Sequence, residues 1–179
     1  MTNNDCLRKI RYIFDYSDKQ MIDIFSQADL AVTRQQISSW LKRDDDPDYH
    51  SCSDTTLATF LNGLINLKRG RRDGEQPKPE KHINNNIVFM KLKIALNLKA
   101  EDILALLELA GLSISKHELS AFFRKAGHKH YRQCKDQILR NFLYGLQLQN
   151  RGDSEAFEDE NEAADKRQTS INPSIWKQS

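Results

Sequence analysis

Glycine, proline and cysteine are scarce in this chain of 179 residues, which has 7, 4 and 3 of them respectively. So few turn-forming residues disfavour a many-stranded β-sandwich or barrel. Runs of β-branched residues, which mark buried strands, are missing as well. The cysteines at 6, 52 and 134 are odd in number and far apart, so we expect reduced thiols rather than a disulfide framework. These absences favour an all-α protein.

Long apolar runs are also absent. No stretch approaches the roughly 18 apolar residues that a membrane span needs, and the N-terminal MTNNDCLRKIRY has no apolar segment of a secretory signal. The chain combines 39% hydrophobic and 29% charged residues with a net charge of +2, which allows a real core and differs from a disordered composition. We therefore expect a cytoplasmic protein with no membrane partner.

The chain repeats itself at an offset of 82 residues. Residues 3–70 align with residues 85–152 without a gap, and 16 of the 68 pairs are identical. The apolar pattern agrees more fully than the identities do. This duplication divides the chain into a first repeat (1–70), a linker (71–82), a second repeat (83–152) and a tail (153–179).

Each repeat is predicted to form four short helices, because apolar residues recur on one face at helical spacing. The strongest stripe has i, i+3, i+4, i+7 spacing in the fourth helix, at Leu57, Phe60, Leu61 and Leu64 and again at Leu139, Phe142, Leu143 and Leu146. Capping-box patterns begin at Ser17, Thr33 and Ser115. Asn4 and Asn86 are predicted to cap the first helices, and Gly70 and Gly152 to end the fourth.

A glycine interrupts the fourth helix of each repeat, at Gly63 and Gly145. Glycine there costs about 1 kcal/mol relative to alanine, which indicates a close helix crossing with no room for a Cβ. Each repeat is short and buries little surface alone, so we expect the two to pack as a pseudo-symmetric pair through helix four and its glycine. A domain-swapped or symmetric dimer is an alternative.

Charge is divided unevenly along the chain. Residues 83–152 hold 11 basic and 5 acidic residues, whereas residues 1–70 hold 9 and 10. Residues 153–165 contain seven acidic residues and no basic one, which predicts a solvated, disordered tail. Near the end of the chain, Asn172 and Pro173 could begin one short helical turn that places Ile171, Ile175 and Trp176 on one face, as a docking peptide for the body of the protein or for a partner.

Helices two and three of each repeat resemble a helix-turn-helix, with a capped third helix of about ten residues. In the first repeat the outward residues are Arg34, Gln35, Ser38, Lys42 and Arg43. The second repeat is the better candidate for contact with DNA or RNA because its net charge suits phosphate. The candidate nucleic-acid or partner face there comprises Lys116, His117, Ser120, Arg124, Lys125, Lys129 and Arg132.

Catalytic and metal-binding patterns are weak. Candidate metal ligands are Asp48, His50 and Cys52 and, in the second repeat, His128, His130 and Cys134, but their spacing matches no standard zinc motif. Cys52 and Cys134 are better explained as small apolar residues beneath helix four. The sequence has no glycine-rich phosphate loop and no GxSxG nucleophile motif. We expect no enzyme activity, no catalytic residues, no bound metal and no cofactor.

Three runs of the sequence carry a family resemblance: NNDCLRKIRYIFDYSD, ISSWLKRDDDPDY and LATFLNGLINLKRG. They resemble the YehS-like bacterial proteins, which carry a tandem domain of unknown function, DUF1456. The resemblance covers residues 1–152 and implies a cytoplasmic bacterial protein of two homologous helical domains. It implies no reaction, ligand or partner.

Two classes of function follow from the residues. The first is a nucleic-acid-binding, regulatory protein that uses helix three of the second repeat. The second is a protein-interaction module or a homodimer without a nucleic-acid role. One continuous basic face would favour the first class, whereas an exposed apolar groove lined by Phe and Leu side chains would favour the second.

Overall fold

The computed structural model describes residues 1–152, which form α-helices and no β-strand. The helices are α1 (Asn3–Phe14), α2 (Asp18–Gln27), α3 (Arg34–Leu41), α4 (Asp54–Arg69), α5 (Asn85–Ala95), α6 (Ala100–Leu109), α7 (Lys116–Phe122) and α8 (Asp136–Arg151). Each repeat contributes four of them, which confirms the predicted all-α class with two four-helix repeats. The tail 153–179, including its predicted disorder and its predicted turn at Asn172, lies outside the described residues.

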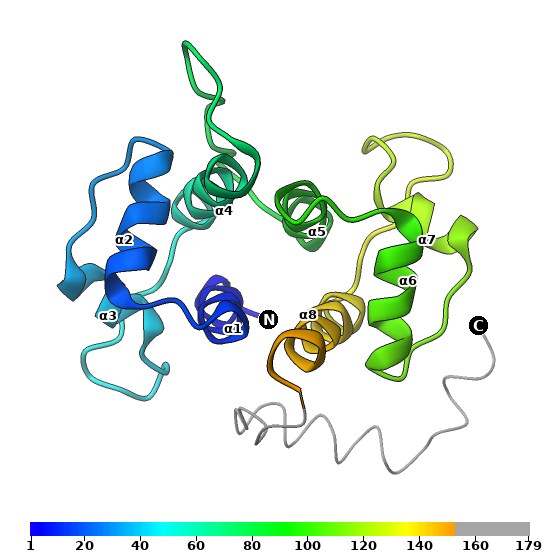
Figure 1. Cartoon of the computed structure of the whole chain (residues 1–179), viewed down its shortest axis with the longest axis horizontal. Coiled ribbons are helices and arrows are strands. Elements are labelled where there is room, and N and C mark those ends of the chain that lie inside the picture. The colour runs from blue at the N-terminus through cyan, green and yellow to red at the C-terminus, as the bar shows by residue number, and fades with distance from the viewer. Residues whose placement is uncertain (153–179) are drawn as a thin grey trace.

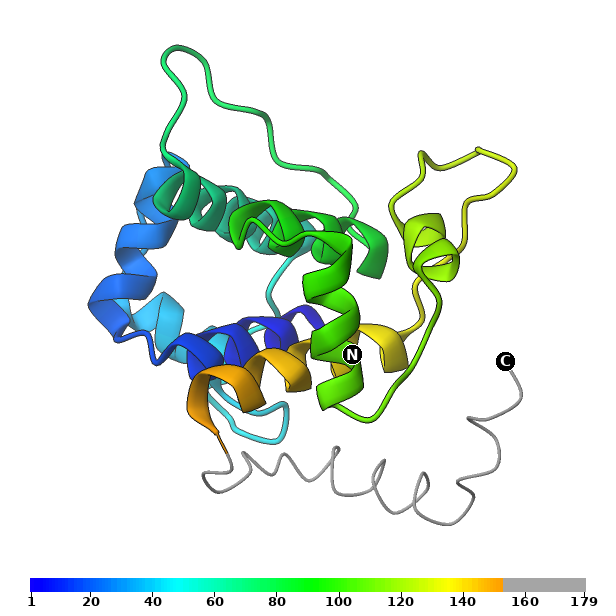
Figure 2. The same cartoon turned by 45° about the vertical axis from the view of Figure 1, so that its right-hand side comes forward.

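Four helices, α1, α4, α5 and α8, run side by side through the centre of the molecule (Figures 1 and 2). Helices α2 and α3 flank them at one end, and α6 and α7 flank them at the other. Across the two repeats, α4 packs on α5 and α1 packs on α8. Because each of these pairs joins a first helix to a fourth helix, the repeats are related by a pseudo-two-fold axis, like the subunits of an isologous dimer.

The glycines inside α4 and α8 mark helix crossings within each repeat. A Cβ on Gly63 would lie 1.9 Å from the main-chain oxygen of Ile24, and a Cβ on Gly145 would lie 2.1 Å from that of Leu106. The predicted close crossing is therefore confirmed. Its place is different from our expectation, because these glycines contact α2 and α6 of their own repeats. The contact between repeats does use the fourth helices, as expected, but each packs on the first helix of the other repeat.

Aromatic side chains fill the centre of each repeat. The ring of Phe25 lies 5.2 Å from Phe60, and the ring of Phe89 lies 4.6 Å from Phe142, measured between centroids. All four rings are fully buried. Buried residues of both repeats form one continuous cluster, so the pair of repeats shares a single hydrophobic core. A domain of this combined size buries a larger fraction of its surface than either half could alone.

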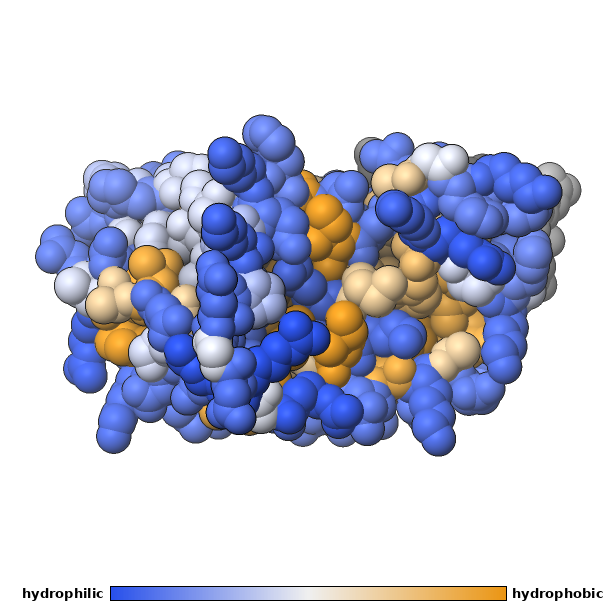
Figure 3. All heavy atoms as spheres, turned by 90° about the horizontal axis from the view of Figure 1, so that it is seen from above, coloured by the Kyte–Doolittle hydropathy of each residue, from blue (hydrophilic) through white to orange (hydrophobic). Residues whose placement is uncertain are grey.

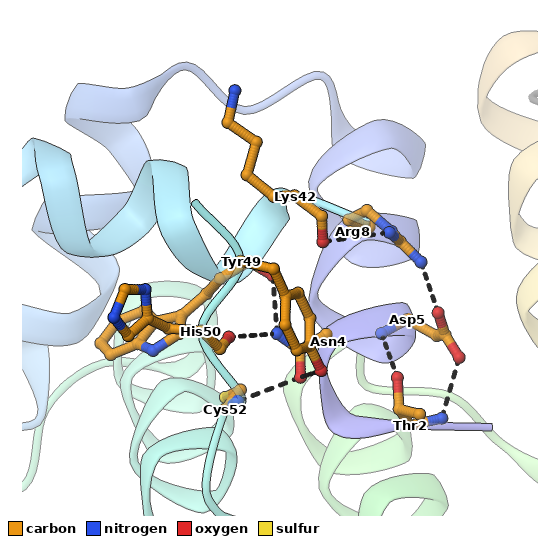
Figure 4. A network of polar contacts seen from close by, with 9 residues as sticks. Thr2, Asn4, Asp5, Arg8, Lys42, Tyr49, His50 and Cys52 are labelled. Carbon is orange, nitrogen blue, oxygen red and sulfur yellow. Dashed lines mark hydrogen bonds and ion pairs between the residues drawn. The ribbon is translucent and has the colours of Figure 1, made fainter. Parts of the chain in front are cut away.

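Asn4 and Asn86 hold the loop before the fourth helix, a role that differs from the predicted helix cap. The Asn4 side-chain amide donates to the main-chain oxygens of Trp40 and His50, at 2.9 and 2.8 Å. Its oxygen accepts from the main-chain N–H of Cys52 at 3.0 Å (Figure 4). Asn86 repeats this pattern on the main chain of Phe122, Arg132 and Cys134. Both asparagines are buried, so the bonds satisfy polar groups that water does not reach.

The helix ends follow the sequence at most other positions. Ser17 and Thr33 form complete capping boxes, whereas Ser115 accepts from the main-chain N–H of Glu118 without the reciprocal main-chain bond. Gly70 and Gly152 end α4 and α8 with φ of +93° and +65°, a conformation that favours glycine. The caps of α1 and α5 are Thr2 and Asn84, which stand ahead of the asparagines that we expected to cap them.

A carboxylate at the start of each fourth helix ties the two repeats together. Asp54 accepts hydrogen bonds from the Asn3 side chain at 2.7 Å and from the main-chain N–H of Ile83 at 3.1 Å. Asp136 accepts from Asn85 at 2.7 Å and pairs with the amino group of Met1. These donors lower the pKa of both carboxyls, chiefly through Asn3 for Asp54 and through the Met1 amino group for Asp136.

Within residues 1–152, none of the helices has the length and apolar character required to cross a membrane.

Candidate functional site

A groove of about 810 Å³ runs along the side of the molecule where α4 meets α5. Its walls come from the second half of α4, the linker 71–82, the exposed side of α5 and the segment 122–131 that follows α7. Figure 3 shows this face from above, with hydrophobic side chains gathered in a hollow between two hydrophilic parts of the surface. Both repeats contribute to the groove, so it exists only where they meet.

The floor of the groove is apolar. Its residues are Ile65 of α4, Ile87, Met90 and Ile94 of α5, Phe122 at the end of α7 and Phe123 directly after it. Ile94 leaves 45% of its surface exposed. The three α5 residues have i, i+3, i+7 spacing, so they form a second apolar stripe beside the core-facing stripe of the same helix. An exposed apolar hollow rimmed by polar side chains is typical of an interaction site.

The linker lies across the groove and is anchored at several points. Glu80 pairs with the Lys91 amino group of α5 at 3.0 Å. Gln76 accepts from the side-chain amide of Asn66 on α4 at 3.0 Å. Arg71 pairs with Asp29 at 2.8 Å. The linker is therefore a fixed wall of the groove, in addition to being the connection between the repeats.

Four cations surround the apolar floor: Arg69, Arg72, Arg124 and Lys125. All four side chains are exposed. The acidic side chain in the lining is Glu80, and it already pairs with Lys91. Within the part of the chain that the structure describes, the four cations have no acidic partner. The groove thus combines an apolar floor with a net positive rim, which favours an apolar segment flanked by acidic groups.

The equivalent surface on the other side of the pseudo-two-fold axis is polar. The positions of Ile87 and Met90 are taken there by Asp5 and Arg8, which pair with each other on α1. The Arg8 guanidinium also donates to the main-chain oxygen of Lys42 at 3.3 Å (Figure 4). These contacts bridge the space between α1 and the loop after α3. The same backbone arrangement therefore carries an apolar groove on one side and a polar surface on the other.

The end of this second surface is closed by a stacked pair. Arg151, equivalent to Arg69, lies over the ring of Tyr12, equivalent to Ile94, at 4.1 Å from the ring centroid. It also pairs with Asp15 at 3.6 Å. The closed surface engages its arginine in internal contacts, whereas the groove leaves Arg69 exposed on its rim.

The residues of the predicted nucleic-acid face do not share one helix face. Helix α7 has seven residues rather than the expected ten and ends at Phe122, with Phe123 as its cap. Arg124 and Lys125 therefore leave the helix and line the groove. Lys116, the first residue of α7, pairs with Glu101 at 2.9 Å. Helix α3 is also shorter than expected, with eight residues.

The remaining residues of that face border a small hollow of about 160 Å³, which His117, Lys129 and Arg132 help to line. Ser120 donates to the main-chain oxygen of His117 at 2.8 Å, an internal helical contact. The His130 ring lies 5.5 Å from that of His128 and 6.4 Å from that of His117, between centroids. Six of the seven predicted residues thus divide between this hollow, the groove rim and the ion pair of Lys116 with Glu101 of α6, whereas Ser120 bonds within its own helix.

The candidate metal ligands do not converge. Among residues 1–152 there is no group of three or more His, Cys, Asp or Glu side chains arranged to hold a metal ion. Cys52 and Cys134 are buried beneath the fourth helices, as the sequence indicates. Burial is the largest cause that raises the pKa of each thiol to about 12. Cys6 is likewise buried, and its pKa is raised to about 12.

The groove floor was not predicted from the sequence, although the sequence contains a signal for it. The apolar residues that α4 and α5 contribute to the floor correspond to polar or aromatic residues in the other copy. Ile87, Met90, Ile94 and Ile65 are equivalent to Asp5, Arg8, Tyr12 and Gln147, in that order. Most core positions stay apolar in both copies, although buried Ala58 corresponds to Arg140. Positions that are apolar in only one copy indicate a surface that changed after duplication.

Comparisons with known proteins agree with the duplication. The model of a protein family of unknown function, DUF1456, matches residues 3–70 and again residues 85–152. The chain is 42% identical over 147 residues to the uncharacterized protein YehS of Escherichia coli (strain K12), a match that covers 82% of this chain and 94% of the relative. No solved structure matches the chain. The chain therefore belongs to the DUF1456 family and carries two tandem copies of its domain.

Proposed function

We propose that this chain is a non-catalytic, cytoplasmic protein-interaction module whose groove holds a short apolar segment flanked by acidic residues. The observation that carries the proposal is the apolar floor formed by half-buried Ile87 and Met90 and exposed Ile94, beneath a rim of cations without acidic partners in the described residues. Apolar side chains in the hollow supply most of the binding free energy, at about 25 cal/mol per Å² of buried apolar surface. The rim cations select acidic flanks and speed association.

The contrast between the two sides of the molecule supports a role in binding. Large apolar residues on a surface are unfavourable unless something covers them. On the opposite side, the same helix positions carry the Asp5–Arg8 pair and the Arg151–Tyr12 stack. The fold itself therefore does not require an apolar surface at these positions, so Met90 and Ile94 are explained by a ligand rather than by stability.

A selection from random peptides displayed on phage tests this proposal. Full-length protein is immobilised, and dodecapeptides are selected at low ionic strength. We expect enriched peptides to combine two or more large apolar residues with several Asp or Glu. Their affinity should fall at least about tenfold on Ile94→Asp, because a carboxylate would be desolvated on the groove floor.

Leu109→Asp is the matched control for this substitution. Leu109 is 53% exposed on α6 and lies outside the groove lining. Peptides that bind wild type and Leu109→Asp equally, but not Ile94→Asp, would support the groove as the site. Enriched peptides that bind Ile94→Asp as tightly as the wild type would exclude the groove, and so would the absence of any enrichment.

Nucleic-acid binding is the second candidate function. It is favoured by the cations Arg124, Lys125, Lys129 and Arg132, which follow one another along the exposed segment after α7. Most of the groove floor is aliphatic, and its Phe122 and Phe123 are partly buried, which suits apolar side chains better than bases that stack on open aromatic faces. Fluorescence anisotropy with labelled duplex DNA, single-stranded DNA and RNA across a salt series tests this function. Binding that weakens steeply with salt and falls on Arg124→Glu would support it, whereas no binding at low salt would exclude it.

A further inference from the structure

We infer that the groove is occupied in the free protein by the tail of the same molecule, so that the chain masks its own binding site. This inference rests on the proposed function of the groove and names its first occupant. The proposed contact places the apolar residues Ile171, Ile175 and Trp176 on the groove floor. The acidic residues that precede them face the cationic rim.

Charge complementarity is the first argument. Residues 153–165 contain seven acidic residues and no basic residue. The rim has four exposed cations, Arg69, Arg72, Arg124 and Lys125, without acidic partners in residues 1–152. Asp29 pairs with Arg71 and Glu101 pairs with Lys116, and the linker residues Asp73 and Glu75 are not part of the groove lining. The tail therefore supplies the charge that the groove lacks.

Apolar complementarity is the second argument. The tail has three large apolar residues within residues 171–176, immediately after a polar stretch. A floor built from Ile65, Ile87, Met90 and Ile94 can cover such side chains. Burial of one tryptophan and two isoleucines would offset the entropy of ordering the tail.

The length of the tail allows the contact within one molecule. Helix α8 ends at Gly152 on the side where α1 and α8 pair, whereas the groove lies along α4 and α5 (Figure 2). Residues 153–170 can extend to about 60 Å. A compact body of 152 residues is about 40 Å across. When extended, residues 153–170 span the diameter of the body and about half of its circumference, so the tail is long enough to reach the groove.

Tethering makes docking within the molecule more favourable than docking between copies. A tether of this length holds its end at an effective concentration of about 1 mM, well above the concentration of the protein in solution. With an untethered affinity of about 100 µM, about nine molecules in ten would be closed at that effective concentration. A partner would then bind with about tenfold lower apparent affinity, because only the open fraction is competent. The docked tail would therefore raise the partner concentration that is needed to fill the groove.

Trp176 provides a direct measurement in the full-length chain. The sequence has two tryptophans, and Trp40→Phe leaves Trp176 as the single fluorophore. This change is conservative because Phe122 occupies the equivalent position of the second repeat. In the Trp40→Phe protein, we expect a blue-shifted emission and several-fold weaker acrylamide quenching than for free tryptophan. Adding Ile94→Asp should return both values to those of free tryptophan, whereas adding Leu109→Asp should not.

The dependence of Trp176 emission on protein concentration distinguishes docking of the molecule's own tail from docking of the tail of a second copy. Emission that is unchanged on hundredfold dilution supports docking within the molecule, whereas loss of the blue shift on dilution would overturn it in favour of a second copy. A shielded Trp176 that is insensitive to Ile94→Asp would show that the tail docks elsewhere, which also overturns the inference. High salt should weaken the shielding by screening the rim.

The outcome for the tail is distinguishable from the outcome for the groove. If selected peptides bind the groove while Trp176 behaves as free tryptophan in the same protein, the tail inference fails and the proposed function stands. If the peptides fail to bind and Trp176 is exposed, both fail. If Trp176 is shielded and a selected peptide releases it in proportion to the groove occupancy, both are supported.

Discussion

The guanidinium of Arg151 lies 4.1 Å from the centroid of the Tyr12 ring and donates to the main-chain oxygen of the same tyrosine at 2.9 Å. On the other side of the pseudo-two-fold axis, the equivalent residues are Arg69 and Ile94, and Ile94 offers no aromatic ring. The Arg151–Tyr12 pair closes one surface, whereas Arg69 and Ile94 leave the groove open. Residues of the closed surface therefore show which substitutions should close the groove.

Ile94→Tyr should close the groove by reproducing this stack. We expect Arg69 to lie over the new ring, peptide affinity and Trp176 shielding to fall several-fold, and the free energy of unfolding to change by less than about 0.5 kcal/mol, as for most surface substitutions. Urea denaturation and peptide titration measure the two effects. Ile94→Leu serves as the control that keeps the groove open. Unaltered peptide binding by Ile94→Tyr would contradict the role of this position.

Gly63→Ala should destabilise the protein by about 3 kcal/mol, because the new Cβ would overlap the main-chain oxygen of Ile24 and would force α2 and α4 apart. Gly145→Ala should have a similar effect against Leu106. Gly70→Ala is the matched control, since nothing lies within 4 Å and the cost comes from its φ of +93° alone, about 1 kcal/mol. Equal losses at Gly63 and Gly70 in urea denaturation would argue against the close crossing.

Asn4→Ala and Asn86→Ala should each reduce the free energy of unfolding by about 3 kcal/mol. Each substitution leaves two carbonyl groups and one N–H without a partner next to the core, and an unsatisfied buried group costs about 1–3 kcal/mol. Gln35→Ala, on the exposed side of α3, should change stability by less than about 0.5 kcal/mol. Stability of Asn86→Ala within that same range would show that the loop is not held by this residue.

Acid should weaken the contact between the repeats. The pKa of Asp54 is lower in the folded protein than its ordinary value of 3.8, chiefly through the Asn3 hydrogen bond. The folded state therefore binds fewer protons, so this stabilisation is complete above the unfolded pKa and is lost as the pH falls toward the folded pKa. Asp54→Asn keeps an acceptor oxygen and should flatten the dependence of the urea midpoint on pH below about pH 5. An unchanged slope in that range would exclude Asp54 as a contributor.

The thiols should be unreactive in the folded protein. Cys6, Cys52 and Cys134 are buried, and the pKa of each is raised to about 12, so the thiolate that reacts is scarce and shielded at neutral pH. With Ellman's reagent we expect no rapid labelling in native buffer and three equivalents after unfolding in guanidinium. Rapid labelling of one thiol in the native protein would show local opening around that cysteine.

The fold was largely predictable because its signals are local. The stripe at Leu57, Phe60, Leu61 and Leu64 specifies one buried face, and Gly70 ends the helix where the stripe ends. Agreement between two copies of the sequence makes each such signal stronger. The close crossing at Gly63 followed from the energetic penalty of glycine in a helix, although the sequence could not tell which helix crosses there.

The site was less predictable because it depends on packing between repeats. Sequence spacing placed Arg124 and Lys125 on a recognition helix, but α7 ends at Phe122 and the main chain turns these cations toward the groove. The role of Asn86 was hidden for a similar reason, since its partners lie 36 and 46 residues away. Contacts of this range follow from the assembled fold rather than from neighbouring residues.

The pseudo-two-fold arrangement has a consequence for the history of the groove. A homodimer built from one repeat would carry two identical surfaces, so any substitution that opened one would open the other at the same time. Fusion into a single chain removed that constraint. Met90 and Ile94 could then arise on one side while Arg8 and Tyr12 sealed the other. Covalent linkage of the two copies thus allows a pseudo-symmetric scaffold to carry the apolar groove on one side only.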